Sequence, residues 1–485
     1  MPDVKAVLLA GGRDERLWPL STPELPKAFL SLTGPDSLLR QTFQRIVPWL
    51  PAEAVYVVAA REHGDLVRQQ LPELPPDNLI LEPAPRNTGP ALGLAALWLE
   101  AVDPATPLVV LPVDHWIGGE RRFRAALEAA VAGARQGWVV TLGLPPTRPE
   151  TGYGYIEVGE PIAPATGPGD PPGNPPGDGR GSGPGKAGGG LPLYTARRFV
   201  EKPGPAEARE LVASGRYWWN AGIFVLTREV LAQEIAEHLP GLHGLLGEIR
   251  VAAAAEGLAA AVERLFPRAE AVSFDHGVCE HSHRLAVVPA LFEWSDIGDW
   301  SALGRVLPRD HRQNASQGEA ALVDSEGLVV HAGTDRLVVA LGVRDLIIAE
   351  TEEAVLVCHR DQAQGVREVA RWAGPLAGAL ARGRLPAGPA EERPWGREIR
   401  WASGPGYAAR VLEVRPGRSL GPTAEPGRHE TFWVQSGRGR LRVGEAWQPL
   451  GAGDVFTVSP GAVLEVQAVT SLALVGVSAP AGQGG

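Results

Sequence analysis

Residues 4–30 read VKAVLLAGGRDERLWPLSTPELPKAFL, and this stretch decides the fold. It opens with a mostly apolar run at 4–10, whereas a half-exposed strand would alternate apolar and polar residues. A run of this kind is typical of a strand in a parallel sheet that is covered on both faces. The run ends in Gly11 and Gly12, where backbone N–H groups can approach an anion because no Cβ is in the way. A plain tight turn explains the Gly-Gly pair equally well when the pair is taken alone.

The first 300 residues repeat this pattern of short apolar runs and longer stretches with helical periodicity. The alternation predicts a Rossmann-like α/β domain with a mixed, mostly parallel sheet, in which ligands bind beyond the carboxyl ends of the strands. We place this domain at residues 1–310. A Gly- and Pro-rich segment at 163–192 interrupts it and is expected to be a flexible surface insert. The expected strands are 4–10, 55–59, 108–111, 138–143 and 285–288, and the expected helices are 38–47, 90–101, 121–135 and 205–214.

The character of the sequence changes after residue 310. Short β-like pieces and a helical piece at 362–372 predict either an all-β layer or a few solenoid turns, similar to a β-helix, for residues 311–385. Residues 386–485 carry further strand-like pieces separated by turn signals, which predicts a small β-sandwich or barrel. The α/β domain is therefore expected to be followed by two β-rich parts.

The composition excludes several classes of protein. Apolar residues make up 44% and charged residues 21% of the 485 residues, so neither global disorder nor a fibrous fold is expected. There is no run of about 18 apolar residues, and no membrane span is predicted. The net charge of −10, without a basic run, argues against a nucleic-acid-binding surface. Two cysteines and the lack of a signal-peptide pattern fit a cytoplasmic protein without a disulfide framework.

Two motifs place aspartates just beyond predicted strands. Asp114, in the motif PVDHW, directly follows the strand at 108–111, and Asp296, in WSDIGDW, follows another strand-like piece. An aspartate in such a place lies over the ligand-binding crevice, although a helix N-cap explains PVDHW equally well by itself. Two carboxylates are what Mg²⁺ usually takes from a protein. The two motifs therefore predict a magnesium site if they meet in the fold.

Arg16 and Lys27 bring two cations to the end of the first predicted strand. With them, residues 8–30 resemble the signature of the sugar-1-phosphate nucleotidyltransferases, and LWPLS at 17–21 resembles the mannose-1-phosphate guanylyltransferase branch of that family. The chain has only four lysines, and Lys27 and Lys202 fall where the family contacts phosphate. A lysine that remains among so many arginines is consistent with a need for a compact ammonium group, which a guanidinium cannot replace.

The resemblance implies transfer of GMP from GTP to mannose 1-phosphate, with release of pyrophosphate. It implies Arg16, Lys27 and Asp114 as catalytic residues and Asp114 and Asp296 as ligands of Mg²⁺. Such transfers depend on positioning and charge neutralisation more than on a covalent nucleophile. Asp275, in VSFDHGVCE, is interpreted as structural, with a place in the sugar pocket as the alternative.

The same resemblance implies two further groups of binding residues, carried by the strings EPAPRNTGPA, PETGYGYIEVG, RFVEKP and WNAGIFV. A solvated strand end is the alternative explanation for the charged pair in RFVEKP. The implied nucleotide-binding residues are Leu9, Ala10, Gly11, Gly12, Arg86, Asn87 and Thr88, and the implied sugar-phosphate-binding residues are Gly152, Glu201, Lys202 and Asn220.

The phosphate loop departs from the family pattern. The family normally has Gly-Gly-x-Gly-Thr/Ser-Arg, whereas Arg13, Asp14, Glu15 and Arg16 follow the two glycines here. Carboxylates beside a triphosphate oppose its binding unless they point away or are compensated by Arg13 and Mg²⁺. Two alternatives to the predicted function stay open: a nucleotidyltransferase for another nucleotide or sugar 1-phosphate, and a catalytically weakened sugar-nucleotide-binding protein.

Residues 393–420 resemble the opening of the isomerase half of the bifunctional (type II) guanylyltransferase/mannose-6-phosphate isomerases, which is a cupin-like barrel. In that family a His-x-His cluster, a glutamate and a later histidine hold the barrel's metal. Only the glutamate, Glu430, is kept here, because residues 425–427 (Glu-Pro-Gly) and Leu464 fall where the histidines belong. One carboxylate with His429 does not make a closed metal site. We therefore predict that this domain lacks its metal ligands and isomerase activity and serves packing or homodimer formation.

Overall fold

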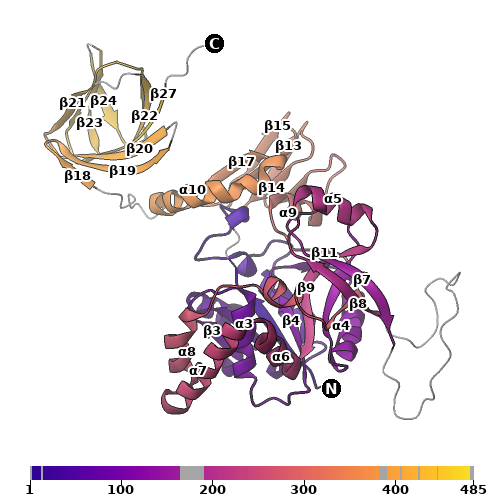
Figure 1. Cartoon of the computed structure of the whole chain (residues 1–485). Coiled ribbons are helices and arrows are strands. Elements are labelled where there is room, and N and C mark those ends of the chain that lie inside the picture. Colours follow the sequence, from indigo (N-terminus) through magenta and orange to yellow (C-terminus); the bar gives the residue numbers. More distant parts are fainter. Residues whose placement is uncertain are drawn as a thin grey trace, which may run out of the picture. The chain divides into compact units, whose positions relative to one another are not determined.

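The computed structural model divides the chain into two compact units, and its helices and strands are labelled in Figure 1. Unit 1 comprises Met1–Glu350 with Leu356–Val366, and unit 2 comprises Thr351–Val355 with Arg367–Gly485. Most of the predicted insert, 164–190, lies outside the described residues. None of the described helices is both long and apolar enough to cross a membrane. The structure describes residues 3–12, 15–163, 191–381, 390–404, 407–423, 427–444 and 446–480.

A nine-stranded sheet forms the centre of unit 1. Its strands are β1 (Lys5–Ala10), β2 (Val55–Ala60), β3 (Leu79–Glu82), β4 (Pro107–Pro112), β6 (Val139–Leu144), β7 (Tyr155–Ile162), β8 (Leu193–Val200), β9 (Tyr217–Thr227) and β10 (Leu285–Pro289), in the order β3-β2-β1-β4-β9-β6-β10-β8-β7. The first four strands in this order pair in parallel, as do β6 and β10. β9 runs antiparallel between β4 and β6. The predicted mixed α/β fold is confirmed.

Helices cover both faces of this sheet. Their bounds are α1 (Leu38–Ile46), α2 (Gly64–Gln70), α3 (Thr88–Trp98), α4 (Glu120–Ala134), α5 (Pro205–Ala213), α6 (Arg228–His238), α7 (Pro240–Glu256) and α8 (Leu258–Leu265). A further helix, α9 (Trp300–Val306), packs instead against the strands at 315–317 and 329–332. α1, α2, α4 and α5 contribute to one apolar core, and α3, α6, α7 and α8 contribute to a second. Helices α3, α6, α7 and α8 also lie together in Figure 1. Because both faces are covered, the strands are buried and read as apolar runs.

A two-stranded ribbon joins the two aspartate motifs. Its strands, β5 (Trp116–Ile117) and β11 (Trp294–Ser295), pair antiparallel, with Trp294 opposite Ile117. β5 begins two residues after Asp114, and β11 ends directly before Asp296. The ribbon therefore brings two segments that are far apart in the sequence to the same place beside the main sheet.

The segment after α9 is a β-solenoid. Its strands are β12 (Ala315–Gln317), β13 (Ala320–Val323), β14 (Val329–Ala332), β15 (Val338–Leu341), β16 (Leu346–Glu350) and β17 (Val355–His359), and α10 (Val366–Ala381) follows them. β12, β14 and β16 pair in parallel, and β13 pairs in parallel with β15. Of the two expected arrangements, the structure has the solenoid turns.

Antiparallel strands make up the rest of unit 2. Their bounds are β18 (Ala390–Arg393), β19 (Gly396–Gly404), β20 (Tyr407–Val414), β21 (Ser419–Thr423), β22 (Arg428–Ser436), β23 (Arg438–Val443), β24 (Trp447–Gly451), β25 (Val455–Val458), β26 (Leu464–Ala468) and β27 (Leu472–Pro480). They form one sheet of six and one of four strands. Phe432, Val434 and Leu474 are buried in a single apolar core. The predicted cupin-like fold is confirmed.

Candidate active site

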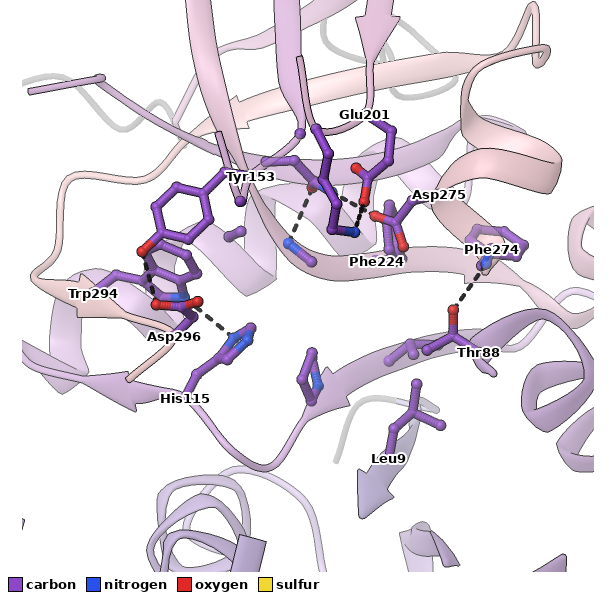
Figure 2. Close-up of a pocket in the computed structure, with 18 of the residues that line it drawn as sticks. Leu9, Thr88, His115, Tyr153, Glu201, Phe224, Phe274, Asp275, Trp294 and Asp296 are labelled. Carbon is purple, nitrogen blue, oxygen red and sulfur yellow. Dashed lines mark hydrogen bonds and ion pairs between the residues drawn. The ribbon is translucent and has the colours of Figure 1, made fainter. Parts of the chain in front are cut away.

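A cavity of about 190 Å³ opens beyond the carboxyl ends of β1 and β4. Figure 2 shows that its polar side chains form two groups. One group contains His115, Tyr153 and Asp296, and the other contains Glu201 and Asp275. Among the residues predicted from the sequence, those that line the cavity are Leu9, Thr88, Gly152, Glu201, Lys202, Asn220, Asp275 and Asp296.

Lys27 joins the two aspartate motifs. It begins a short 3-10 turn, Lys27–Phe29, after Pro26, and its side chain is almost completely buried. Its Nζ lies 2.7 Å from Asp114 Oδ2 and donates a hydrogen bond of 2.7 Å to the main-chain carbonyl of Asp296. A single ammonium group thus contacts both motifs, and Lys27, Asp114 and Asp296 meet at one place.

The carboxylate of Asp296 is held by its own group of partners. Its Oδ1 accepts hydrogen bonds from the Tyr153 hydroxyl at 2.7 Å and from the backbone N–H of Gly298 at 3.1 Å. The Trp294 indole donates to His115 Nδ1 at 3.3 Å, and the ring of Tyr153 packs edge-on against that of Trp294 with centroids 5.1 Å apart. These contacts fix where the carboxylate points.

The electrostatics keep Asp114 charged. Burial opposes ionisation of this side chain, but the charge of Lys27 and that of His115 outweigh it, so the pKa of Asp114 is lowered. Burial lowers the pKa of His115, with Asp114 acting against the shift. Burial also raises the pKa of Tyr153, and the Asp296 carboxylate adds to that rise, so Tyr153 stays a hydrogen-bond donor.

The other group is built around Asn220. Its Nδ2 donates to Asp275 Oδ1 at 2.7 Å, while its Oδ1 accepts from the Thr141 hydroxyl at 2.7 Å and from the Gly222 backbone at 3.1 Å. Burial, followed by the charge of Glu201, raises the pKa of Asp275 to about 6. Asp275 therefore both orients Asn220 and lines the cavity, so the structure supports both alternatives that the sequence left open for it.

The charged pair Glu201 and Lys202 lies at the edge of the same group. The two side chains form an ion pair, and Lys202 has a positive φ of 48°. The Lys202 backbone N–H donates to the carbonyl of Tyr153 at 3.2 Å. Both residues line the cavity, so this strand end faces the cavity as well as solvent.

Some of the predicted nucleotide-binding residues lie at the cavity, and others lie away from it. Thr88 begins α3, and its hydroxyl accepts a hydrogen bond from the Phe274 backbone at 2.8 Å, beside the cavity. Asn87 caps the same helix with a φ of 71°. The Arg86 guanidinium instead donates to the carbonyl of Pro267 and does not line the cavity.

The glycine turn after β1 lies outside the set of cavity-lining residues, together with Ala10 and Arg16. Lys27 and Asp114 are not in that set either, although their neighbours His115 and Asp296 are. Gly12 has a φ of 116°, which disfavours any residue with a Cβ, and the space around it is open. Arg16 belongs to a 3-10 turn, Glu15–Leu17. Arg13 and Asp14 lie outside the described residues, as do residues 424–426 of the predicted barrel site.

The sequence analysis assigned no role to four residues that shape this site: His115, Thr141, Tyr153 and Trp294. Three of them, His115, Tyr153 and Trp294, lie in motifs in which other residues were predicted to have the functional role. Thr141 has a different signal, because it is a buried hydroxyl in the otherwise apolar strand β6. A polar residue in such a strand needs a hydrogen-bond partner, which here is Asn220.

Comparison with known proteins identifies the family of the domain that contains this cavity. Residues 5–313 match the family described as Nucleotidyl transferase. The chain belongs to this family. Residues 318–371 match the MannoseP isomerase/GMP-like beta-helix domain, and residues 410–477 match the Cupin domain. The resemblance to the bifunctional guanylyltransferase/isomerase group is thereby confirmed, and with it the presence of a nucleotidyltransferase enzyme domain.

Relatives extend over most of the chain. The Xanthan biosynthesis protein XanB of Xanthomonas campestris is 34% identical over 450 residues, 92% of this chain and 88% of that protein. The Mannose-1-phosphate guanylyltransferase of Klebsiella pneumoniae is 32% identical over 440 residues, 90% of this chain and 87% of that protein. Among solved structures, a Thermus thermophilus protein described as a mannose-1-phosphate geranyltransferase superposes with a TM-score of 0.64 at 35% identity. The match covers 77% of this chain and 99% of that one.

Proposed function

We propose that the chain transfers GMP from GTP to mannose 1-phosphate, giving GDP-mannose and pyrophosphate. The observation that carries this proposal is the contact of one buried ammonium group, Lys27 Nζ, with both aspartate motifs at the cavity. Relatives named as mannose-1-phosphate guanylyltransferases support the choice of substrates.

The donor set at this place suits a hard divalent cation. Asp114 and Asp296 contribute carboxylate oxygens, which are the ligands that Mg²⁺ prefers. Tyr153 and Gly298 donate to Oδ1 of Asp296, and Lys27 Nζ lies beside Oδ2 of Asp114, so the other oxygen of each carboxylate is the proposed ligand. We propose that these two side chains hold Mg²⁺. A bound Mg²⁺ would supply charge neutralisation for the triphosphate.

In the proposed reaction a phosphate oxygen of mannose 1-phosphate attacks the α-phosphorus of GTP. The new O–P bond forms as the bond from the α-phosphorus to the bridging oxygen breaks, and pyrophosphate leaves with that oxygen. Lys202 binds the attacking phosphate, and Asn220, held by Asp275, orients the sugar. Lys27 and Arg16 offset charge on the triphosphate. Positioning and fixed charges of this kind account for much of the rate of phosphoryl transfer.

The experiment that tests the proposal measures pyrophosphate release by the purified chain with GTP, mannose 1-phosphate and Mg²⁺. Turnover that requires all three supports it. Turnover only with another nucleoside triphosphate or sugar 1-phosphate favours the related nucleotidyltransferase instead. Binding of GDP-mannose without any turnover favours a sugar-nucleotide-binding protein.

Lys202 offers a prediction about the sugar phosphate. Replacing Lys202 with arginine keeps the charge but changes a compact ammonium into a wider planar group at a residue with positive φ. We expect the KM for mannose 1-phosphate to rise about tenfold, the loss of roughly one charge-assisted hydrogen bond, while the KM for GTP is unchanged. Steady-state kinetics with each substrate varied in turn measure both values.

The matched control is Arg198→Lys, in β8 and four residues before Lys202. Arg198 is exposed and pairs with Glu207 away from the cavity. Its substitution is expected to leave both KM values unchanged. Wild-type kinetics for Lys202→Arg would show that Lys202 does not bind the sugar phosphate.

We also propose that the cupin domain has no isomerase activity. The buried Glu430, which keeps the place of the family's metal-binding glutamate, accepts a hydrogen bond from the Arg410 guanidinium. Arg410 Nη1 also lies 3.4 Å from Oε1 of the buried Glu398. Leu464, at the place of the later histidine, is buried in the apolar core. The residues described at these positions therefore do not fit the isomerase metal, because Glu430 is the only potential ligand among them, it is paired with Arg410, and Leu464 offers no donor atom.

The expected result is no conversion of mannose 6-phosphate to fructose 6-phosphate with Mg²⁺, Mn²⁺, Co²⁺ or Zn²⁺. The same preparation must release pyrophosphate from GTP and mannose 1-phosphate, which shows that the protein is folded and active. Appreciable isomerisation with any of these ions would contradict the proposal for this domain.

A further inference from the structure

A second cluster of potential metal ligands lies at the end of α6, away from the cavity described above. Glu234, Glu237 and His238 each offer one ligand atom, and the three atoms lie within 4.8 Å of one another. Glu234 and His238 are four residues apart on the helix, a spacing that places both side chains on one face. His238 is the last residue of α6, and the partial negative charge at a helix C-terminus favours a cation there.

The distances within the cluster are close to those of a tetrahedral metal site. His238 Nε2 lies 3.5 Å from Glu234 Oε2 and 4.0 Å from Glu237 Oε1. In a tetrahedral zinc site with bonds of 2.0–2.1 Å, two ligand atoms are about 3.3 Å apart. Small rotations of the exposed Glu237 side chain and of His238 would close this difference.

An unpaired buried oxygen points to a missing ligand in the cluster. The Glu234 side chain is only 2% exposed, and its Oε2 has no hydrogen-bond donor among the described residues. Leaving such an oxygen without a partner is unfavourable, and buried carboxylates without one are rare. A metal ion bound between Oε2 and His238 Nε2 would satisfy it.

The surroundings orient this oxygen toward His238. The other oxygen, Oε1, lies 3.9 Å from Arg284 Nε, and the same arginine donates to Gln233 at 2.6 Å. Arg284 therefore lies beside Oε1 of Glu234, and Oε2 faces the imidazole of His238. Outer contacts of this type commonly hold metal ligands in place.

The cluster is accessible from solvent. His238 lines a separate cavity of about 510 Å³, together with residues 239–242, 244, 245, 248, 268–270 and 272. Water from this cavity can complete the coordination, and the ring of His281 lies 6.3 Å from that of His238, centroid to centroid. An ion can thus reach the cluster without unfolding α6.

We propose that Glu234, Glu237 and His238 bind one Zn²⁺ ion, independently of the Mg²⁺ pair Asp114 and Asp296. One imidazole with two carboxylates suits Zn²⁺ better than Mg²⁺, which prefers oxygen ligands alone. The bound ion stabilises the last turn of α6 at the corner where the chain enters α7.

The test uses the full chain, freed of metal by a chelator and then kept in excess Mg²⁺ so that the oxygen-rich site is saturated. Zn²⁺ affinity is measured by competition with a chromophoric chelator, and Co²⁺ replaces Zn²⁺ for visible absorption. We expect one Zn²⁺ per chain, a tetrahedral Co²⁺ spectrum, and an affinity at least about tenfold weaker in His238→Gln, since even the loss of an outer contact has an effect of that size.

The matched control is His243→Gln, an exposed histidine five residues further along, on α7. It is expected to bind Zn²⁺ like the wild type. Glu237 is more than half exposed, so Glu237→Gln carries the test if His238→Gln does not fold. Equal Zn²⁺ affinity in the wild type and in the folded ligand variant would overturn the proposal. So would the lack of Zn²⁺ binding by the wild type, which would leave only a His238–Glu234 ion pair.

Discussion

Replacing Asp296 with asparagine is expected to lower kcat for guanylyl transfer by about 10²- to 10³-fold or more. The substitution is nearly isosteric, and the amide oxygen can still accept from the Tyr153 hydroxyl and the Gly298 backbone, which contact Oδ1 at 2.7 and 3.1 Å. The side chain should therefore stay in place and lose only its negative charge. Without that charge, the proposed Mg²⁺ pair is reduced to Asp114. Pyrophosphate release, measured over a range of Mg²⁺ concentrations, gives the effect on kcat and on the requirement for the ion.

The control lies three residues away in the same motif. Asp299 caps α9 by accepting a hydrogen bond of 2.7 Å from the Ala302 backbone, and it does not line the cavity. Asparagine is as good an N-cap as aspartate. The other oxygen, Oδ2, accepts a hydrogen bond of 2.5 Å from the Gln364 amide, which can turn over and accept from the new NH₂ group, so Asp299→Asn is expected to keep wild-type kcat. If Asp296→Asn kept more than a tenth of the wild-type rate, this carboxylate would not hold the proposed ion.

The main sheet could be predicted because its strands are covered on both faces. The runs expected at 55–59 and 108–111 correspond to β2 and β4, whose residues are almost all buried. β9 is not among the expected strands, since its opening residues combine indole rings with Asn220. β5 and β11 have only two residues each, and no periodicity can appear in so short a strand. The contact between the two aspartate motifs therefore had to be inferred from their positions at strand ends.

The polar residues of the site were predictable where a motif carries them to the edge of the sheet. Asp114 and Asp296 each follow a strand that ends there, Lys27 begins a short 3-10 turn, and the structure brings the three together. Side chains that act through tertiary contacts could not be inferred in this way. Tyr153 reaches Asp296 from the segment before β7, and Arg86 donates to the carbonyl of Pro267 although it lies just before the N-cap of α3. Rotamer choices of this kind depend on packing that is set by distant parts of the chain.

Replacing Lys27 with arginine is expected to lower kcat by about 10²- to 10³-fold, although the charge is retained. The Lys27 side chain is only 4% exposed, and its single nitrogen lies 2.7 Å from both Asp114 Oδ2 and the Asp296 carbonyl oxygen. A guanidinium is wider and spreads its charge over three nitrogens, so it cannot make both contacts from one point in the same space. Asp114 and the backbone at Asp296 should then move apart, which displaces the proposed ion relative to the triphosphate.

Lys5→Arg is the matched control, because Lys5 lies at the start of β1, at the opposite end of the strand from the cavity. Its activity should equal that of the wild type. Circular dichroism and the Tm of Lys27→Arg show whether the variant is folded, and binding of GTP in the absence of sugar phosphate shows whether the cavity is intact. A folded Lys27→Arg enzyme with wild-type kcat would mean that any cation suffices at this position. In that case the small number of lysines in the chain would carry no information about where phosphate binds.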